Sequence, residues 1–410
     1  MLTIEEKELF KEIFDHLGTA LDITETEFNG IVRSYDAVGK WLAQPNSTLA
    51  PYKPVIRPQG SFMLGTMIKP ICDKDDLDID LVCELSKKPA SWTQYHLKQK
   101  IGDRLKLHEK YRDMMEEEGR RCWVLKYADS ANYHMDILPS IVCDEYDRVL
   151  NLTYSYDLNE IEYSSLAIRI TDKLQENYYT ETATQYWMKS NPFGFGRWFY
   201  EMADIKEYRK HFKLSDSVKP IPQYNSNKLP LQKVVQILKR HRDRMFTGDE
   251  DKPISIIITT LAARAYRKET DIMDSLMNVV STMRDFIEPR FDPISGKIIK
   301  WVENPVNPEE NFADKWVEYP QREKNFYRWL DKLESDLNNI IQKRGMGLHV
   351  ISNNMKEAFG ENTVNKVFSR IGELRYNEQK EGALRMAIGT GILGNSGEVP
   401  VKSHNFHGNL

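Results

Sequence analysis

The sequence predicts an α/β fold in which a mixed sheet with helices is followed by a helical lobe. In the first half of the chain, short apolar runs of strand length are separated by polar stretches. After residue 230, apolar residues recur at helical spacing almost to the end. A stretch that carries Pro220, Pro222 and Pro230 separates the two patterns and indicates a linker. We therefore expect two lobes, with the active site in the cleft between them.

Each element of the first lobe follows from a local pattern. Two helical apolar stripes, over residues 9–17 and 28–42, predict a pair of N-terminal helices. Four apolar runs then predict strands, and a polar span predicts a helix. The strands are Val55–Ile56, Leu77–Val82, Cys122–Tyr127 and Tyr133–Ile141, and the helix is Tyr95–Glu118. The turn-rich residues 128–132 predict that the last two strands form a hairpin.

The second lobe is predicted to consist of helices. They begin at residue 231 and continue over residues 254–266, 272–286, 323–342 and 354–376. The predicted domains are a core lobe with the N-terminal helices at 1–215, a linker at 216–230, the helical lobe at 231–395 and a polar tail at 396–410.

Composition excludes several classes of protein. Of the 410 residues, 40% are hydrophobic and 29% are charged, which is typical of a globular chain rather than a disordered one. The longest apolar run, Ile254–Ala263, is roughly half the length of a membrane helix, so we expect no membrane span. A net charge of −4 argues against an obligatory nucleic-acid partner. The acidic N-terminus and four cysteines without pairing or zinc spacing favour a reduced, cytoplasmic protein.

A Gly-Ser turn is the first candidate for binding chemistry. Gly60 and Ser61 follow the predicted strand at Val55–Ile56 and precede a short apolar segment. At a helix N-terminus, such a turn presents backbone N–H groups to an anion such as a triphosphate. The dipeptide alone is also a common structural turn.

Two aspartates alternate with aliphatic residues in the predicted strand at 77–82. Because alternate residues of a strand share a face, Asp78 and Asp80 point the same way and the aliphatic residues face the core. Neighbouring carboxylates repel unless a cation neutralises them, and their hard oxygen atoms suit Mg²⁺. The structural alternative is a solvated edge strand. A calcium loop is excluded, because Leu81 and Lys87 occupy the positions where it needs Gly and Glu.

Asp136 interrupts the apolar strand at 133–141, where a carboxylate is costly unless it is paired or bound to a metal. If this strand lies beside that of Asp78 and Asp80, three carboxylates meet. Such a site suits two-metal nucleotidyl transfer, so we expect two Mg²⁺ ions, with Mn²⁺ as a substitute. Asp136 is also a candidate to accept the proton of the attacking hydroxyl. His134, on the same face, is expected to be a hydrogen-bonded structural residue.

The Gly-Ser turn, the paired aspartates and the later strand aspartate together resemble the polymerase-β-like nucleotidyltransferase superfamily. Longer segments narrow this resemblance to the bacterial cGAS/DncV-like nucleotidyltransferases (CD-NTases). The segments are Gln59–Thr66, Asp78–Leu81, Leu231–Asp243 and Pro253–Thr260, within a resemblance that extends over roughly residues 20 to 390.

The resemblance implies a polymerase-β-like nucleotidyltransferase core, a C-terminal helical lobe and a defined activity. Such enzymes join nucleoside triphosphates into cyclic di- or trinucleotide messengers and release pyrophosphate. In anti-phage CBASS systems, the product activates a downstream effector, and accessory proteins take part. The implied metal-binding carboxylates are Asp78, Asp80 and Asp136. The implied nucleotide-binding residues are Gln59, Gly60 and Ser61 at the turn, with Lys239 and Ser255 contacting the triphosphate from the second lobe.

The local sequence around the second-lobe residues is compatible with these roles. Lys239 lies on the polar face of its predicted helix, and Ser255 follows Pro253 at the start of another. The structural alternatives are a solvated lysine and a helix-cap serine. The basic run Lys239–Arg242 is also compatible with RNA binding, although a phosphate site or a solvated face is the more frequent role.

Two other functions remain open at this point. One is another transferase of the same superfamily, such as a template-independent RNA-tailing enzyme. It would need a longer basic path, and the net charge of −4 argues mildly against it. The other is a non-catalytic module that senses nucleotides or RNA, against which the presence of all three carboxylates argues.

Overall fold

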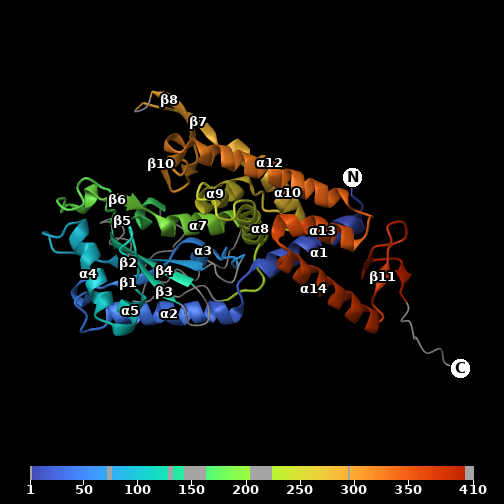
Figure 1. Cartoon of the computed structure of the whole chain (residues 1–410), viewed down its shortest axis with the longest axis horizontal. Helices are drawn as coiled ribbons and strands as arrows, with labels where there is room; N and C mark the ends of the chain where they lie inside the picture. Colours follow the sequence, from blue (N-terminus) through green and yellow to red (C-terminus); the bar gives the residue numbers. More distant parts are fainter. Residues whose placement is uncertain are drawn as a thin grey trace. The chain divides into compact units, whose positions relative to one another are not determined.

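The computed structural model describes residues 2–71, 76–127, 133–142, 163–203, 224–293 and 296–401 (Figure 1). Contacts divide the chain into two units. The sheet unit comprises Ile23–Asn227 and Glu303–Asn311, and the helical unit comprises Met1–Asp22, Lys228–Val302 and Phe312–Leu410.

The sheet unit is built on a six-stranded mixed sheet. Five strands follow the order β1-β2-β4-β5-β6, and the sixth strand, β3, also pairs with β4. The strands are β1 (Val55–Pro58), β2 (Leu77–Leu85), β3 (Trp123–Tyr127), β4 (Tyr133–Val142), β5 (Ile168–Ile170) and β6 (Met188–Ser190). Strands β2 and β4 run parallel and the other pairs are antiparallel. The mixed sheet and the pairing of β3 with β4 confirm the sequence prediction.

One face of this sheet carries the core of the unit. Leu77, Ile79 and Leu81 of β2 are buried with Met135 and Ile137 of β4. Helices α2 (Glu25–Ala43), α4 (Gln94–Lys106) and α5 (Glu109–Met114) contribute to the same core. Figure 1 shows α2 running along the sheet. Because the apolar side chains face this core, the polar side chains of β2 and β4 lie on the opposite face.

Helix α2 begins where the sequence provides a cap. The Thr24 side chain accepts a hydrogen bond from the Glu27 backbone N–H, and the Glu27 carboxylate accepts one from the Thr24 backbone N–H. The remaining helices of the unit are α3 (Gly60–Leu64) and α7 (Pro192–Met202). Short 3₁₀ helices span Ala50–Tyr52, Tyr163–Leu166 and Thr184–Tyr186, and β9 (Glu303–Asn304) pairs with β10 (Asn307–Asn311).

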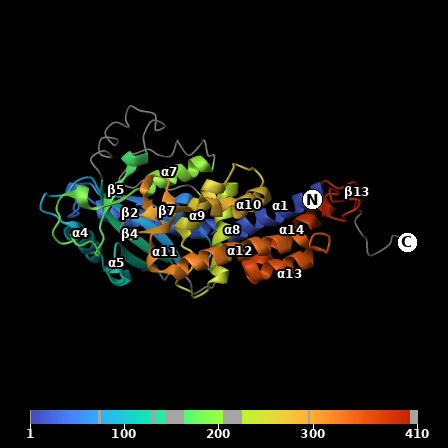
Figure 2. The same cartoon turned by 90° about the horizontal axis from the view of Figure 1, so that it is seen from above.

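The helical unit packs around α8 (Pro230–Met245). Leu231, Val234, Val235 and Leu238 form the buried stripe that the sequence predicts. Figure 2 shows α8 among its neighbours. The other helices are α1 (Ile4–Leu21), α9 (Ser255–Ala265), α10 (Ile272–Thr282), α11 (Lys315–Glu318), α12 (Pro320–Gln342), α13 (Leu348–Phe359) and α14 (Glu361–Lys380), with a 3₁₀ helix at Met283–Phe286. None of the helices in the described ranges is both long and apolar enough to cross a bilayer.

The first N-terminal helix belongs to the helical unit, so its predicted place in the core lobe is wrong. Helix α1 packs against α8, α10 and α14. Gly18 allows the contact, since a Cβ atom there would lie 2.9 Å from the Lys233 Cβ atom. Lys233 also pairs with Asp15 at 2.6 Å. These contacts join residues far apart in sequence, which periodicity within α1 does not encode.

Strands in the second half of the chain were also not predicted. Strands β7 (Glu288–Asp292) and β8 (Lys297–Trp301) form a hairpin. The predicted polar tail at 396–410 begins inside a small sheet, because β13 (Val399–Pro400) and β12 (Leu393–Gly394) both pair with β11 (Arg385–Met386). The predicted helix at Tyr95–Glu118 is two helices, α4 and α5. Residues 216–223 of the predicted linker and the 128–132 connection lie outside the described residues.

Candidate active site

The strand register brings the three predicted carboxylates together. In the parallel pair of β2 and β4, Asp80 lies opposite Asp136, and Asp78 lies opposite His134. Residues paired across neighbouring strands share a face of the sheet, as do residues two apart on one strand. Asp78, Asp80 and Asp136 therefore occupy one polar face, as the sequence predicted.

Burial makes this group electrostatically unfavourable without a cation. Asp78 is exposed, whereas Asp80 and Asp136 are half-buried. Burial raises the pKa of the Asp136 carboxyl, and the negative charge of Asp78 raises it further. A divalent cation would relieve both effects, and the carboxylate oxygens are the donor type that Mg²⁺ prefers. In the described part of the chain, no group of three Asp, Glu, His or Cys side chains is already arranged as metal ligands.

The Gly-Ser turn lies directly against Asp80. The Gln59 backbone N–H donates a hydrogen bond of 2.9 Å to the Asp80 carbonyl oxygen. Gly60 has a φ of 58°, and a Cβ atom on it would lie 2.3 Å from the Asp80 Oδ2 atom. Only glycine fits this left-handed conformation and close approach. Ser61 follows in the first turn of α3, so Gln59, Gly60 and Ser61 are placed beside the carboxylates.

Helix α7 supports this turn from within the sheet unit. The Tyr200 hydroxyl donates a hydrogen bond of 2.7 Å to the Met63 carbonyl oxygen in α3. Gly196 lies so close that a Cβ atom on it would be 2.6 Å from the Met63 Cε atom. Sequence reasoning missed Tyr200 as a residue that positions the turn. The signal in the sequence was the aromatic content of Pro192–Met202, which does not identify a partner in α3.

A buried ion pair joins β1 and β2 on the face of the sheet that carries Asp78 and Asp80. Arg57 Nη2 and Glu84 Oε1 are 3.0 Å apart, and both side chains are almost fully buried. Burial lowers the pKa of the Arg57 guanidinium, although Glu84 opposes this shift. The Arg57 guanidinium also lies 4.6 Å from the centre of the Phe193 ring in α7. This pair therefore joins the strands that carry the turn to the helix that supports it.

His134 has the structural role that the sequence predicted. Its Nε2 atom lies 2.5 Å from Asp76 Oδ2, and Lys126 Nζ lies 3.3 Å from the same oxygen. Burial alone would raise the pKa of Asp76, but the hydrogen bonds from His134 and Lys126 lower it. This cluster fixes the residue that enters β2, two positions before Asp78.

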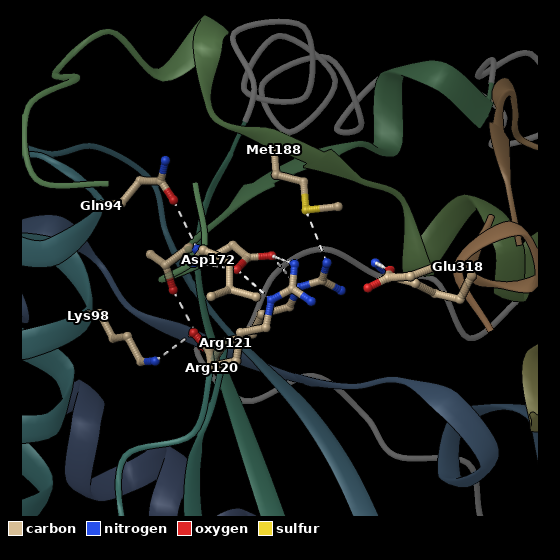
Figure 3. A network of polar contacts seen from close by, with 10 residues as sticks. Gln94, Lys98, Arg120, Arg121, Asp172, Met188 and Glu318 are labelled. Atoms are coloured by element: carbon tan, nitrogen blue, oxygen red, sulfur yellow. Dashed lines mark hydrogen bonds and ion pairs between the residues drawn. The ribbon is translucent and has the colours of Figure 1, made fainter. Parts of the chain in front are cut away.

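A second polar network holds the segment that leads into β3 (Figure 3). The Asp172 carboxylate is fully buried and accepts hydrogen bonds of 2.7 and 2.6 Å from Arg120 and one of 2.8 Å from Arg121. The Asp172 backbone N–H donates to Gln94, and Lys98 Nζ donates to the Arg120 carbonyl oxygen. Because β3 pairs with the strand of Asp136, this network stabilises one flank of the site.

Lys239 and Ser255 lie in the helical unit, where their predicted contacts with a triphosphate remain predictions. Lys239 is buried on α8, which contradicts the alternative of a solvated lysine. Ser255 is the first residue of α9 and is half-buried. Arg242 Nη1 donates a hydrogen bond of 3.2 Å to Ser255 Oγ.

The basic run on α8 is buried, and two of its side chains bond to neighbouring helices. Lys239, Arg240, His241 and Arg242 are all at most 6% exposed, so the run is not a solvated surface for RNA. Arg240 donates to Thr363 of α14, and His241 pairs with Asp336 of α12. The Arg240 and His241 side chains therefore connect α8 to α14 and α12.

Comparisons with known proteins show which proteins the chain is similar to. Residues 54–139 match the model of the DncV-like cyclic GMP-AMP synthase nucleotidyltransferase domain. The chain is 27% identical over 413 residues to a c-di-GMP synthase from Roseivirga ehrenbergii, with 100% of both chains covered. It is 22% identical over 392 residues to the cyclic dinucleotide synthase CdnG from Bradyrhizobium diazoefficiens, with 92% of this chain and 89% of that one covered.

Solved structures show the same fold. The complex of Bradyrhizobium diazoefficiens CdnG with GTP aligns with a TM-score of 0.62 at 17% identity, covering 88% of this chain and 99% of that one. A mutant of the Vibrio cholerae dinucleotide cyclase DncV, in complex with ATP, GTP and 5MTHFGLU2, aligns with a TM-score of 0.52 at 15% identity. That alignment covers 89% of this chain and 93% of DncV.

Proposed function

Because the chain belongs to the bacterial cGAS/DncV-like nucleotidyltransferases (CD-NTases), we propose that it joins two nucleoside triphosphates into a cyclic dinucleotide and releases pyrophosphate at each step. The observation that carries this proposal is the opposition of Asp80 and Asp136 on parallel strands, with Asp78 on the same face. In this proposal, the triphosphate binds to backbone N–H groups of the Gly-Ser turn, which lies next to Asp80.

We propose GTP as a substrate and cyclic di-GMP as the first product to test. The support is the full-length similarity to a c-di-GMP synthase, together with the shared fold of CdnG, whose complex contains GTP. A cyclic trinucleotide and the mixed dinucleotides are the other members of this product class.

The three carboxylates are proposed to hold two Mg²⁺ ions, for which Mn²⁺ substitutes. Bound divalent cations would lower the pKa of the attacking hydroxyl and neutralise the charge of the triphosphate. Asp78, Asp80 and Asp136 orient the reactants through their fixed strand positions. The Asp136 carboxylate accepts the proton of the hydroxyl, since it lies on the same face as the other two carboxylates.

The remaining site residues are proposed to bind the nucleotides. Gln59, Gly60 and Ser61 contact phosphate through the turn, and Ser61 adds its hydroxyl. Lys239 supplies a point charge, and Ser255 supplies a hydroxyl donor, to the triphosphate. A cytoplasmic anti-phage role, with an effector that responds to the product and with CBASS accessory proteins, follows from family membership and belongs to the same proposal.

Product analysis tests this function. Purified protein is incubated with the four labelled nucleoside triphosphates and Mg²⁺ or Mn²⁺, and products are treated with phosphatase before chromatography and mass spectrometry. An Asp78→Ala/Asp80→Ala variant is the matched control. We expect a phosphatase-resistant cyclic dinucleotide that the control does not make.

Other products would lead to different conclusions. A ladder of linear products would contradict cyclisation and favour a tailing enzyme. Binding of nucleoside triphosphates without any product, in both metals and with phage-infected cell extract added, would favour a sensing module.

A further inference from the structure

Arg242 connects the end of α8 to the beginning of α9. Its side chain is 8% exposed, and its Nε atom donates a hydrogen bond of 2.6 Å to Asp243. Its Nη1 atom donates to the Pro253 carbonyl oxygen at 2.6 Å and to the Ser255 hydroxyl oxygen at 3.2 Å. One guanidinium therefore fixes both the backbone before α9 and the first side chain of that helix.

The direction of the hydrogen bond determines what the Ser255 hydroxyl can do. Because a guanidinium only donates, the Ser255 oxygen accepts in this contact. Among the described residues, this is the one hydrogen bond of the Ser255 side chain. The hydroxyl hydrogen is thus left to donate to another group, and phosphate oxygen atoms are strong acceptors.

Within the described ranges, no side chain other than Arg242 donates a hydrogen bond to residues 253–255. Ile254, at the N-cap position, makes no side-chain cap, and Ser255 is half-buried at the first helical position. Most α9 residues after the first turn are buried, so the helix itself is firmly packed. The orientation of Ser255 therefore depends on Arg242.

We propose that Arg242 is a positioning residue for nucleotide binding, which orients the Ser255 hydroxyl toward the triphosphate without contacting the reacting atoms. The inference rests on the proposed function, in which Ser255 binds the triphosphate. It predicts that Arg242 acts through Ser255, so that removal of the serine hydroxyl makes the arginine dispensable for nucleotide affinity.

A double-mutant cycle tests this coupling. The variants are Arg242→Lys, Ser255→Ala and the combination, and Arg242→Gln, which keeps an amide donor, replaces the lysine variant if that one does not fold. Arg244→Gln is the matched control, since Arg244 lies on the same helix but is exposed. The readouts are the KM and kcat for GTP, the Kd of a non-hydrolysable GTP analogue and thermal unfolding.

Each single substitution is expected to raise KM and Kd about tenfold with little change in kcat, because this is the effect of losing one charged hydrogen bond. The combined variant should be no weaker than Ser255→Ala alone, and Arg244→Gln should match the wild type. Independent, multiplicative effects, or lower thermal stability with an unchanged Kd, would overturn the proposal for Arg242.

The cycle separates this inference from the proposed function. If the wild type binds GTP and forms product while the effects multiply, only the role of Arg242 is wrong. If the wild type neither binds nucleoside triphosphates nor forms product, the proposed function is wrong, and the inference fails with it.

Discussion

Asp80 of β2 and Asp136 of β4 lie directly opposite each other in a parallel strand pair. The two residues are far apart in sequence, and the apolar residues that alternate with them fix the register by facing the core. A shift of one residue in either strand would turn its carboxylates into the core. The stability of the sheet therefore enforces the close approach of like charges.

Replacement of Asp136 by Asn should abolish product formation while preserving the fold. We expect a loss of at least about 10³-fold in turnover, because a metal-binding and proton-accepting carboxylate is removed. The thermal unfolding temperature without metal should not fall, since a like-charge repulsion is relieved. Product analysis and a thermal scan check both statements, and an active Asp136→Asn enzyme would rule out this role.

The turn at Gly60 should not tolerate any side chain. Gly60→Ala would place a methyl group against the Asp80 carboxylate in a left-handed backbone conformation, and we expect activity to fall about 10²-fold or more. Gly372→Ala in α14 is the matched control, because no atom outside the adjoining helix backbone lies within 4 Å of a Cβ atom there. It should stabilise the protein by about 0.5–1 kcal/mol without affecting activity. Equal activity of the two variants would show that the contact with Asp80 is unimportant.

The hydroxyl of Tyr200 should contribute to activity through Met63. Tyr200→Phe removes a buried hydrogen bond and should cost about 1–2 kcal/mol of unfolding free energy, with about a tenfold loss in kcat/KM. Tyr178→Phe is the control, because the buried Tyr178 hydroxyl has no hydrogen-bond partner within the described ranges. Urea unfolding and initial rates provide the comparison. Similar rates for both variants would mean that α7 does not position the turn.

The buried Asp172 carboxylate should stabilise the protein at neutral pH. Burial would raise its pKa, but the hydrogen bonds from Arg120 and Arg121 lower it below the usual value. A lowered folded-state pKa contributes stability above the unfolded-state pKa of about 3.9 and loses it as the pH falls through the folded-state value. Asp172→Asn should thus cost about 1.5–3 kcal/mol near neutral pH, because a buried acceptor of charged hydrogen bonds is lost while the two guanidinium groups remain partly solvated.

The pH dependence of the cost tests the Asp172 ion pair, and the size of the cost distinguishes it from a surface contact. The cost of Asp172→Asn should be the same at about pH 7 and pH 5.5 and should shrink only below about pH 4. Asp331→Asn is the control, because Asp331 is 65% exposed beside Arg284. Its replacement should lower the free energy of unfolding by less than about 1 kcal/mol. Urea unfolding across this range is the measurement. A cost for Asp172→Asn that shrank already between neutral pH and pH 5.5 would refute the assignment.

The sequence predicted the elements whose local patterns are strong. Alternation around Asp78 identified β2. The cost of burying Asp136 suggested that its strand lies beside β2, as the register shows. Contacts between distant segments were not predictable in this way. The Tyr200–Met63 hydrogen bond spans 137 residues, and the packing of α1 depends on the absence of a side chain at Gly18.

The missed β7–β8 hairpin has a different cause. Phe291 and Ile298 are paired across its two strands and are exposed at 68% and 74%. A hairpin that buries neither of these apolar residues lacks the half-buried alternation by which strands are identified. The sequence therefore predicts only the helices before and after this hairpin.

Manganese binding, measured by electron paramagnetic resonance, tests whether the three strand carboxylates form a metal site. The wild type, Asp80→Asn and Asp136→Asn proteins are titrated with Mn²⁺ in the presence of a non-hydrolysable GTP analogue. If Asp78, Asp80 and Asp136 form the metal site, the wild type binds two ions per nucleotide complex and each variant loses at least one. Equal Mn²⁺ binding by the wild type and both variants would mean that these aspartates do not form the metal site.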